Sequence, residues 1–146
     1  MDAQSPSFLL VDGHSVIHAW EELHRLHLKS AQRHLARLEL LRRLRTYQDM
    51  SGIRVVVVFD GTGTQLTDER ETQGLQIFYA DASRTADSVI ERLVAKYAAT
   101  HALRVATGDR MEWETVRALG ADWLSPLDLR LEVERAEGDL RRRIKK

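Results

Sequence analysis

The sequence predicts an α/β fold, a three-layer sandwich in which a mostly parallel, five-stranded sheet carries helices on both faces. Short apolar runs alternate along the chain with longer segments of helical periodicity, the order that parallel strands and crossover helices require. The runs 8–11 and 53–59 are each followed by Asp-Gly, typical of a buried strand that meets a turn. With 146 residues, the chain fits one domain, 1–146, with a substantial core.

The composition narrows the class of protein. Hydrophobic residues make up 43% of the chain and charged residues 30%, which is ordinary for a globular domain. Cysteine is absent, which excludes disulfides and thiolate metal sites. The apolar run 55–59 is too short to span a membrane, and the first residues lack the features of a secretory signal, so we expect a cytoplasmic protein without membrane contact. The formal net charge is zero, so any contact with nucleic acid must come from a local basic patch.

Local signals place the elements in order. Ser30 and Thr85 are expected helix N-caps, and Gly52 and Gly120 are expected to end helices. Residues 24–29 resemble a polar joint, 61–74 a long loop and 1–7 a flexible N-terminus. We expect strands at 8–11, 53–59, 75–80, 103–106 and 121–124, and helices at 16–20, 31–48, 86–97, 110–119 and from Pro126 onward.

The helix expected at 31–48 combines an apolar stripe with an arginine-rich remainder. We interpret the arginines as a solvated face in preference to a phosphate-contacting surface. The stripe comprises Leu35, Leu38, Leu41, Leu44 and Gln48, widened by Leu40 and Tyr47, and the arginines are Arg33, Arg37, Arg42, Arg43 and Arg45.

Carboxylates collect at one edge of the predicted sheet. Asp12 and Asp60 follow two strands directly, and Asp109 follows a third. Asp87 lies at the start of a helix, with Glu91 one turn further along the same face. Each has a simpler interpretation as a turn or cap residue, and Asp109 with a glutamate at position 112 matches a capping box. Together, however, clustered carboxylates repel one another unless they hold a proton or a cation, and hard oxygen ligands suit Mg²⁺ or Mn²⁺.

Four motifs stand out along the chain: VDGHSVI at the first strand, VVVFDG at the end of the second, TADSVIERL at the start of a helix and the step ATGDR. They resemble the NYN domain of the PIN-like nuclease superfamily, in its YacP-like group. The late segment SPLDLRLEVERAE is similar to the C-terminal helix of that group. The resemblance covers nearly the whole chain in order, and the segment around Asp87 is its most specific part.

The resemblance implies a metal-dependent endoribonuclease that hydrolyses RNA phosphodiester bonds, and some members of the family are thought to act on mRNA at the ribosome. It implies that Asp12, Asp60, Asp87 and Asp109 are the catalytic residues and the ligands of Mg²⁺ or Mn²⁺. The chain departs from the family at two places. His14-Ser15 replaces the usual Tyr-Asn, and Gly108 precedes Asp109 where the family has serine.

We therefore expect single-stranded RNA as substrate, cleaved with one or two metal ions. Ser15 and Glu91 are auxiliary candidates at the site, and His14, Arg84 and Arg110 are candidates for substrate binding. The 61–74 loop is a candidate for gripping RNA. Trp113 is a candidate for base stacking, although core packing is the simpler interpretation. The sequence leaves the oligomeric state open.

Alternative functions fit parts of the sequence. Because Ser15 replaces an asparagine, the main alternative is a PIN-like module that binds RNA or the ribosome with weak or lost catalysis. The run FDGTGT is similar to a haloacid-dehalogenase start, but Val58 stands where that nucleophile is required. His14 and His18, spaced i,i+4, form a possible zinc pair without an HExxH motif. The basic run 141–146 is either an RNA contact or a solvated helix end.

Overall fold

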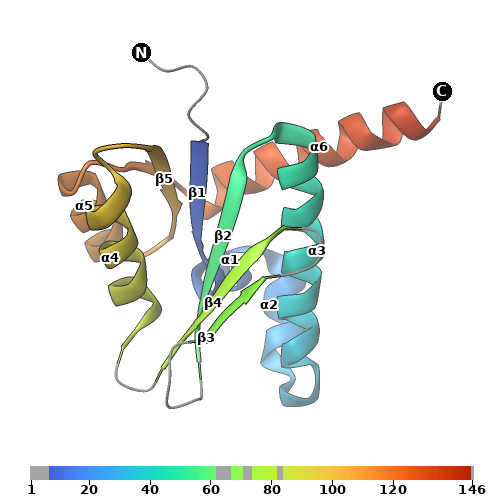
Figure 1. Cartoon of the computed structure of the whole chain (residues 1–146). Helices are drawn as coiled ribbons and strands as arrows, with labels where there is room; N and C mark the ends of the chain where they lie inside the picture. The colour runs from blue at the N-terminus through green and yellow to red at the C-terminus, as the bar shows by residue number, and fades with distance from the viewer. Residues whose placement is uncertain (1–6, 62–66, 71–73, 82–83, 146) are drawn as a thin grey trace.

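One six-stranded sheet forms the centre of the computed structural model, which describes residues 7–61, 67–70, 74–81 and 84–145 (Figure 1). The strand order is β3-β4-β2-β1-β5-β6. Five strands run parallel, as predicted, and β3 pairs antiparallel with β4 at one edge. The strands are β1 (Ser7–Asp12), β2 (Arg54–Asp60), β3 (Thr67–Arg70), β4 (Gln76–Ala80), β5 (Ala102–Ala106) and β6 (Asp122–Leu124).

The extra strand corrects the loop prediction for 61–74. Thr67–Arg70 pairs with Gln76–Tyr79 of β4. Without β3, the outer edge of β4 would leave its backbone N–H and C=O groups unpaired. A strand on one edge does not need the apolar alternation by which buried strands are recognised, so its sequence carries no strand signal. The remaining loop positions 62–66 and 71–73, and positions 1–6 of the expected flexible N-terminus, lie outside the described residues.

Helices cover both faces of the sheet, as predicted (Figure 1). Alternate side chains of each strand point to opposite faces. Leu9 and Val11 of β1 therefore pack with the first group of helices, and Leu10 packs with the second. The first group is α1 (Gly13–Ala19), α2 (Glu21–Leu28), α3 (Arg33–Ser51) and α6 (Pro126–Ile144), and the second is α4 (Ala86–Tyr97) and α5 (Arg110–Ala118).

Three local predictions on the first face are wrong. Residues 24–29 are not a joint but belong mostly to α2, because Leu23 is fully buried in the core and anchors this otherwise polar helix. Ser30 does not cap the next helix: it opens a 3₁₀ turn, Ser30–Gln32, and α3 starts at Arg33. The apolar stripe of α3 is rotated, so that Leu38 is 57% exposed while Leu40 is fully buried.

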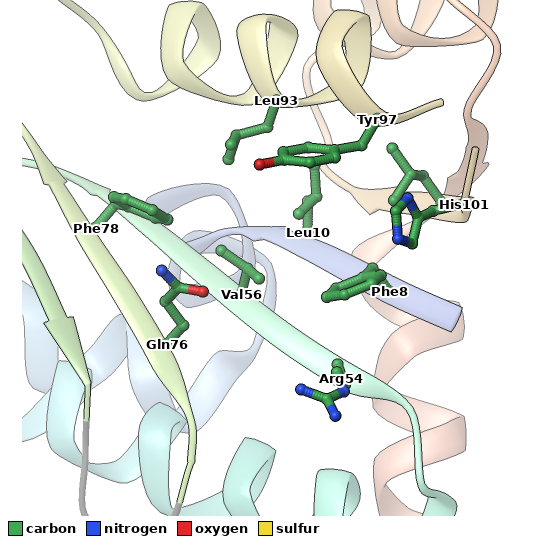
Figure 2. Close-up of a pocket in the computed structure, with 10 residues that line it drawn as sticks. Phe8, Leu10, Arg54, Val56, Gln76, Phe78, Leu93, Tyr97 and His101 are labelled. Carbon is green, nitrogen blue, oxygen red and sulfur yellow. The ribbon is translucent and has the colours of Figure 1, made fainter. Parts of the chain in front are cut away.

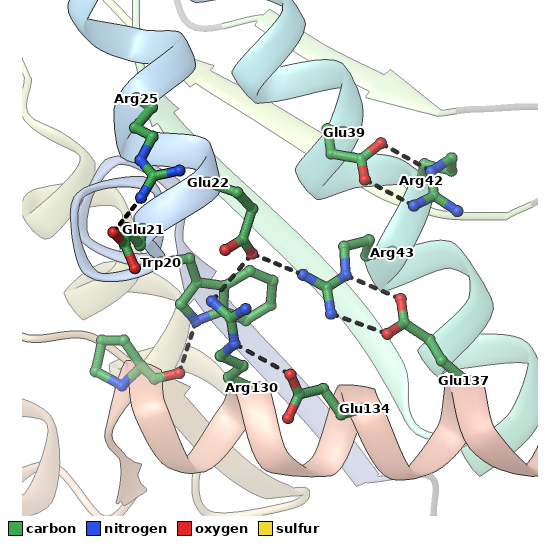
Figure 3. Close-up of polar contacts among 11 residues, drawn as sticks. Trp20, Glu21, Glu22, Arg25, Glu39, Arg42, Arg43, Arg130, Glu134 and Glu137 are labelled. Carbon is green, nitrogen blue, oxygen red and sulfur yellow. Dashed lines mark hydrogen bonds and ion pairs between the residues drawn. The ribbon is translucent and has the colours of Figure 1, made fainter.

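Arg43 of α3 also departs from the predicted solvated face (Figure 3). Its guanidinium forms two hydrogen bonds of 2.9 Å to the Glu137 carboxylate of α6 and one of 3.0 Å to Glu22 of α2. It also stacks over the buried ring of Trp20, 4.9 Å from the ring centroid. A charge this buried requires such partners, and here it joins α2, α3 and α6. Arg42 beside it pairs with Glu39 at the surface.

The predicted helix boundaries at Thr85 and Gly52 are confirmed. The hydroxyl of Thr85 accepts a hydrogen bond from the Ser88 N–H at the start of α4. Gly52 ends α3 with a φ of 76°, a left-handed conformation that glycine adopts without strain. Over the described part of the chain, no helix has the length and apolar character needed to cross a membrane.

Candidate metal centre

Three carboxylates meet at the carboxyl edge of the sheet. Asp12 ends β1, Asp87 lies in the first turn of α4 and Glu112 lies in the first turn of α5. One oxygen of each lies within 4.8 Å of one oxygen of each of the others. Asp12 and Glu112 are buried, at 7% and 2% exposure, and Asp87 is half-buried. The cluster is therefore open toward solvent on the Asp87 side.

The local sequence explains how Asp12 reaches this edge. β1 is hydrogen-bonded to β2 on one side and to β5 on the other, so the position of its carboxyl end, where Asp12 lies, is fixed by both neighbours. Gly13 then starts α1 against Phe59, and a Cβ at this position would lie 2.3 Å from the Phe59 ring. Glycine is therefore required for the chain to turn so closely over β2. Asp12 is the N-cap of α1, since its Oδ1 accepts a hydrogen bond from Ser15 N.

The buried hydroxyl of Thr107 connects two of the carboxylates. Its Oγ1 lies 3.1 Å from Asp12 Oδ2 and 3.3 Å from Glu112 Oε2, and it accepts a hydrogen bond from the Asp109 N–H at 3.1 Å. Ser15 adds a second connection, because its Oγ accepts a 2.5 Å hydrogen bond from Gly108 N. The turn after β5 is thus tied to the start of α1, so the fold itself holds the Asp12 and Glu112 carboxylates in place.

Burial and mutual repulsion disfavour the charged forms of these groups. Burial raises the pKa of the Asp12 carboxyl to about 6, with hydrogen bonding to Glu112 opposing this rise and the charge of Asp87 adding to it. Burial, together with the neighbouring Asp87 and Asp12 carboxylates, raises the pKa of Glu112 far above its ordinary value. Without a cation, Glu112 is therefore protonated at neutral pH.

The donor set fits a hard divalent cation. Oε1 of Glu112 is buried and has no hydrogen-bond partner among the described residues. An unpartnered buried oxygen is costly, and a cation would satisfy it while compensating the charges of all three carboxylates. Carboxylate oxygens alone, without cysteine or histidine, suit Mg²⁺ or Mn²⁺.

Two of the four predicted ligands, Asp60 and Asp109, lie outside this group of three. Asp60 Oδ1 accepts a 2.8 Å hydrogen bond from the Ala86 N–H and so holds the start of α4. Asp109 caps α5, its Oδ1 accepting from Met111 N at 2.9 Å and from Glu112 N at 3.4 Å. Both side chains thus fix the helices that carry Asp87 and Glu112.

Glu91, His14, Arg84 and Arg110, which were also predicted at the site, are not members of the carboxylate cluster. Glu91 is half-buried one turn beyond Asp87. His14 packs on Phe59, and its Nδ1 accepts a 3.4 Å hydrogen bond from Asp60 N. Burial lowers the pKa of His14, against the opposing influence of the Asp60 charge. Arg84 is exposed before α4, and Arg110 is 81% exposed and pairs with Glu114 at 2.9 Å.

Glu112 is the member of the cluster that the sequence did not predict. The spacing of Asp109 and Glu112 predicts a capping box, in which the glutamate would turn back toward the helix start. In the structure only the aspartate half of that box forms, and the glutamate points inward to Asp12 and Thr107. The one available signal was the position of Glu112 in the first turn of α5, the helix that Asp109 caps.

Aromatic side chains lie beside the cluster. Trp113 stacks on Trp123 of β6 with ring centroids 4.5 Å apart, and the Trp123 indole donates a 2.7 Å hydrogen bond to the Thr107 carbonyl. Both rings are partly exposed. Trp113 is therefore not a core residue. One face of its ring is covered by Trp123 and so is not accessible to a nucleobase.

A separate cavity of about 310 Å³ opens beneath the C-terminal half of α4 (Figure 2). Figure 2 shows Leu93 and Tyr97 of α4 above it and Phe8, Val56 and Phe78 of the sheet below. It lies near the amino ends of the strands, and among the described residues no carboxylate lines it. The carboxylate cluster lies at the opposite ends of the strands.

Comparisons with known proteins agree with this architecture. Residues 9–146 match the family model described as the YacP-like NYN domain. A curated relative, the uncharacterized protein YacP of Bacillus subtilis, is 34% identical over 140 residues, covering 94% of this chain and 81% of the relative.

Two solved structures are also similar. A crystal structure of Rae1 (YacP) from Bacillus subtilis superposes with a TM-score of 0.79 at 31% identity, covering 99% of this chain and 80% of that one. A mutant form of the same protein superposes with a TM-score of 0.80 at 31% identity, covering 95% and 81%.

Proposed function

The chain belongs to the YacP-like NYN domain family of the PIN-like nuclease superfamily, and from this premise we propose that it is an endoribonuclease dependent on Mg²⁺ or Mn²⁺. The observation that carries the proposal is the meeting of Asp12, Asp87 and Glu112 at the carboxyl edge of the sheet. In open α/β sheets this edge is where ligands bind.

Asp12, Asp87 and Glu112 would hold the cation, with Asp12 as the central ligand. A divalent cation at such a site supplies positive charge to phosphodiester oxygens and activates water for attack on phosphorus. Thr107 would orient the Asp12 and Glu112 carboxylates. Asp60 and Asp109, which the sequence predicted as ligands, would not contact the cation but would fix the starts of α4 and α5.

We propose RNA, in single-stranded form, as the substrate, and the cytoplasm as the place of action. Arg84 and Arg110 flank the two helix starts and would contact phosphate oxygens, Arg110 by leaving its exposed partner Glu114. His14 lies beside Asp60 at the same edge of the sheet, where its ring would contact a phosphate or ribose oxygen. Ribosome-bound mRNA is the substrate that the family relationship favours.

A cleavage assay tests the proposal. Fluorescently labelled single-stranded RNA, alone or bound to ribosomes, would be incubated with the protein in EDTA, Mg²⁺ or Mn²⁺. We expect cleavage only with a divalent cation, and loss of cleavage in Asp12→Asn. Asp49→Asn, an exposed aspartate of α3, is the matched control and should cleave as the unmodified protein does.

Comparing free RNA with ribosome-bound RNA shows which of the two the protein cleaves. Cleavage of free RNA would make the ribosome dispensable, whereas cleavage of ribosome-bound RNA alone would make it a required partner. Binding of RNA without cleavage in either arm would contradict the nuclease proposal and favour a binding module that has lost catalysis. Ser15, which stands where the family has asparagine, is the residue that motivates this alternative.

A further inference from the structure

Four of the six histidines in the chain form a continuous cluster on α1 and α2, outside the carboxylate site. His14 and His18 lie one turn apart on α1, and His24 and His27 lie one turn apart on α2. The ring centroids of His14 and His27 are 6.0 Å apart, those of His27 and His18 5.1 Å, and those of His18 and His24 5.4 Å. The nuclease chemistry proposed above uses only His14.

The spacing of one pair is that of a metal chelate. Nδ1 of His18 and Nδ1 of His24 lie 3.3 Å apart. Two imidazole nitrogens on a tetrahedral ion at 2.0–2.1 Å are separated by about 3.3–3.4 Å. In the metal-free protein the same two nitrogens are within hydrogen-bonding distance, so one ring donates to the other, and a bound ion would replace the shared proton.

The two helices hold this pair at a fixed separation. The short connection between α1 and α2 is Trp20, whose ring is fully buried and whose indole donates a 2.8 Å hydrogen bond to the Pro126 carbonyl. The guanidinium of Arg43 stacks on the same ring (Figure 3). His18 is exposed and His24 is half-buried, so an ion has access from solvent.

We propose that His18 and His24 form a transition-metal site of the Zn²⁺ class, which His27 completes as a third ligand by rotation of its side chain. Imidazole nitrogen is a good ligand for Zn²⁺ and a poor one for Mg²⁺, so this site and the carboxylate cluster select different ions. A bound ion would cross-link α1 to α2 and thereby stabilise the helix that Asp12 caps. The site shares no ligand with the carboxylate cluster and stands independently of the nuclease proposal.

Metal titration of the untagged, metal-stripped protein tests the site. Zn²⁺ binding would be measured by calorimetry, and Co²⁺ would report four- or five-coordinate geometry through its visible absorption. We expect one Zn²⁺ per chain and a higher thermal midpoint with Zn²⁺ than with EDTA. His18→Gln, His24→Gln and His27→Gln should each weaken Zn²⁺ binding by roughly tenfold or more, since even changes around metal ligands cost 10–100-fold.

Two controls distinguish this site from Zn²⁺ bound at an isolated surface histidine or at the carboxylates. His34→Gln removes an exposed histidine of α3 that lies outside the cluster and should leave Zn²⁺ affinity unchanged. Asp12→Asn should abolish Mn²⁺ binding at the carboxylates and leave Zn²⁺ binding intact. The proposal is overturned if the unmodified protein binds no Zn²⁺, if His18→Gln or His24→Gln binds it as the unmodified protein does, or if Asp12→Asn is the variant that loses it.

Discussion

The hydroxyl oxygen of Thr107 lies 3.1 Å from Oδ2 of Asp12, a carboxylate 95 positions earlier in the chain. The same hydroxyl lies 3.3 Å from Glu112 Oε2 and is fully buried. One small side chain at the end of β5 thus sets the separation of two carboxylates that come from different ends of the sequence. We infer that metal binding depends on Thr107 even though it is not one of the proposed ligands.

Thr107→Val tests this dependence, because valine keeps the shape of the side chain and removes the hydroxyl. We expect Mn²⁺ affinity to fall by roughly 10–100-fold, the usual effect of removing a partner of a metal ligand. Thr115→Val is the matched control, since that hydroxyl bonds to the Met111 carbonyl within α5. Calorimetric Mn²⁺ titration of both variants is the measurement, and equal affinities would refute the role of Thr107.

Glu112→Gln and Asp109→Asn distinguish the observed cluster from the ligand set expected from the sequence. Glutamine at 112 removes one of the three charges, so we expect Mn²⁺ binding and RNA cleavage to fall by roughly 100-fold or more, the upper end of the range for changes around a metal. Asparagine is as good an N-cap as aspartate, so Asp109→Asn should keep α5 in place and retain activity. If Asp109 is itself a ligand, Asp109→Asn will instead lose Mn²⁺ binding.

The raised pKa values of Asp12 and Glu112 predict how stability depends on pH. The folded, metal-free protein binds protons at these groups that the unfolded chain releases above about pH 4. The free energy of unfolding should therefore fall as pH rises, first through the pKa of Asp12 at about 6 and then further because of Glu112. Mn²⁺, which replaces the protons, should reduce this fall.

Urea denaturation in EDTA between about pH 5 and pH 8 measures this effect. Glu112→Gln should flatten the profile and stabilise the metal-free protein at the upper end, because glutamine is neutral without taking up a proton. A metal-free protein whose stability rises over this interval would contradict the assignment of Glu112 as protonated.

Arg43 and Arg42 are neighbours on α3 with different expected contributions to stability. Arg43→Met leaves the half-buried Glu137 carboxylate without Arg43, whereas Glu22 keeps its 3.0 Å ion pair with Arg130. We therefore expect a loss of about 3 kcal/mol or more in the free energy of unfolding, mostly from Glu137. Arg42→Met breaks an exposed pair with Glu39 and should cost no more than about 1 kcal/mol. Urea denaturation of both variants is the measurement, and similar losses would show that the burial of Arg43 adds nothing to the strength of its ion pairs.

Ser15 is tested by Ser15→Ala, which removes the acceptor of the Gly108 N–H. We expect a loss of about 0.5–1.5 kcal/mol in stability, typical of one hydrogen bond, with a decrease in cleavage because the turn before Asp109 loosens. Ser51→Ala is the control. It also removes the acceptor of a backbone N–H, that of Ile53, but at the end of α3, and it should leave cleavage unchanged. Unchanged cleavage in Ser15→Ala would remove Ser15 from the site.

The sequence by itself determined the order of the elements, because periodicity and caps are local properties. The apolar runs predict five parallel strands, and the shared carboxyl edge of those strands is enough to bring Asp12 and Asp87 together. The resemblance in the segments around these residues leads to the same family as the comparisons.

Only the tertiary structure decided which other carboxylate joins them. The spacing of Asp109 and Glu112 predicts a capping box, but in the fold Glu112 turns inward to the hydroxyl of Thr107 and lies beside Asp12, where burial and the neighbouring charges keep it protonated. Arg43 is a similar case. Its position in the periodicity of α3 predicts a solvated residue, but in the fold it is buried and pairs with Glu22 of α2 and Glu137 of α6. Periodicity indicates on which face of its own helix a residue lies, whereas burial depends on which distant segments pack against that face.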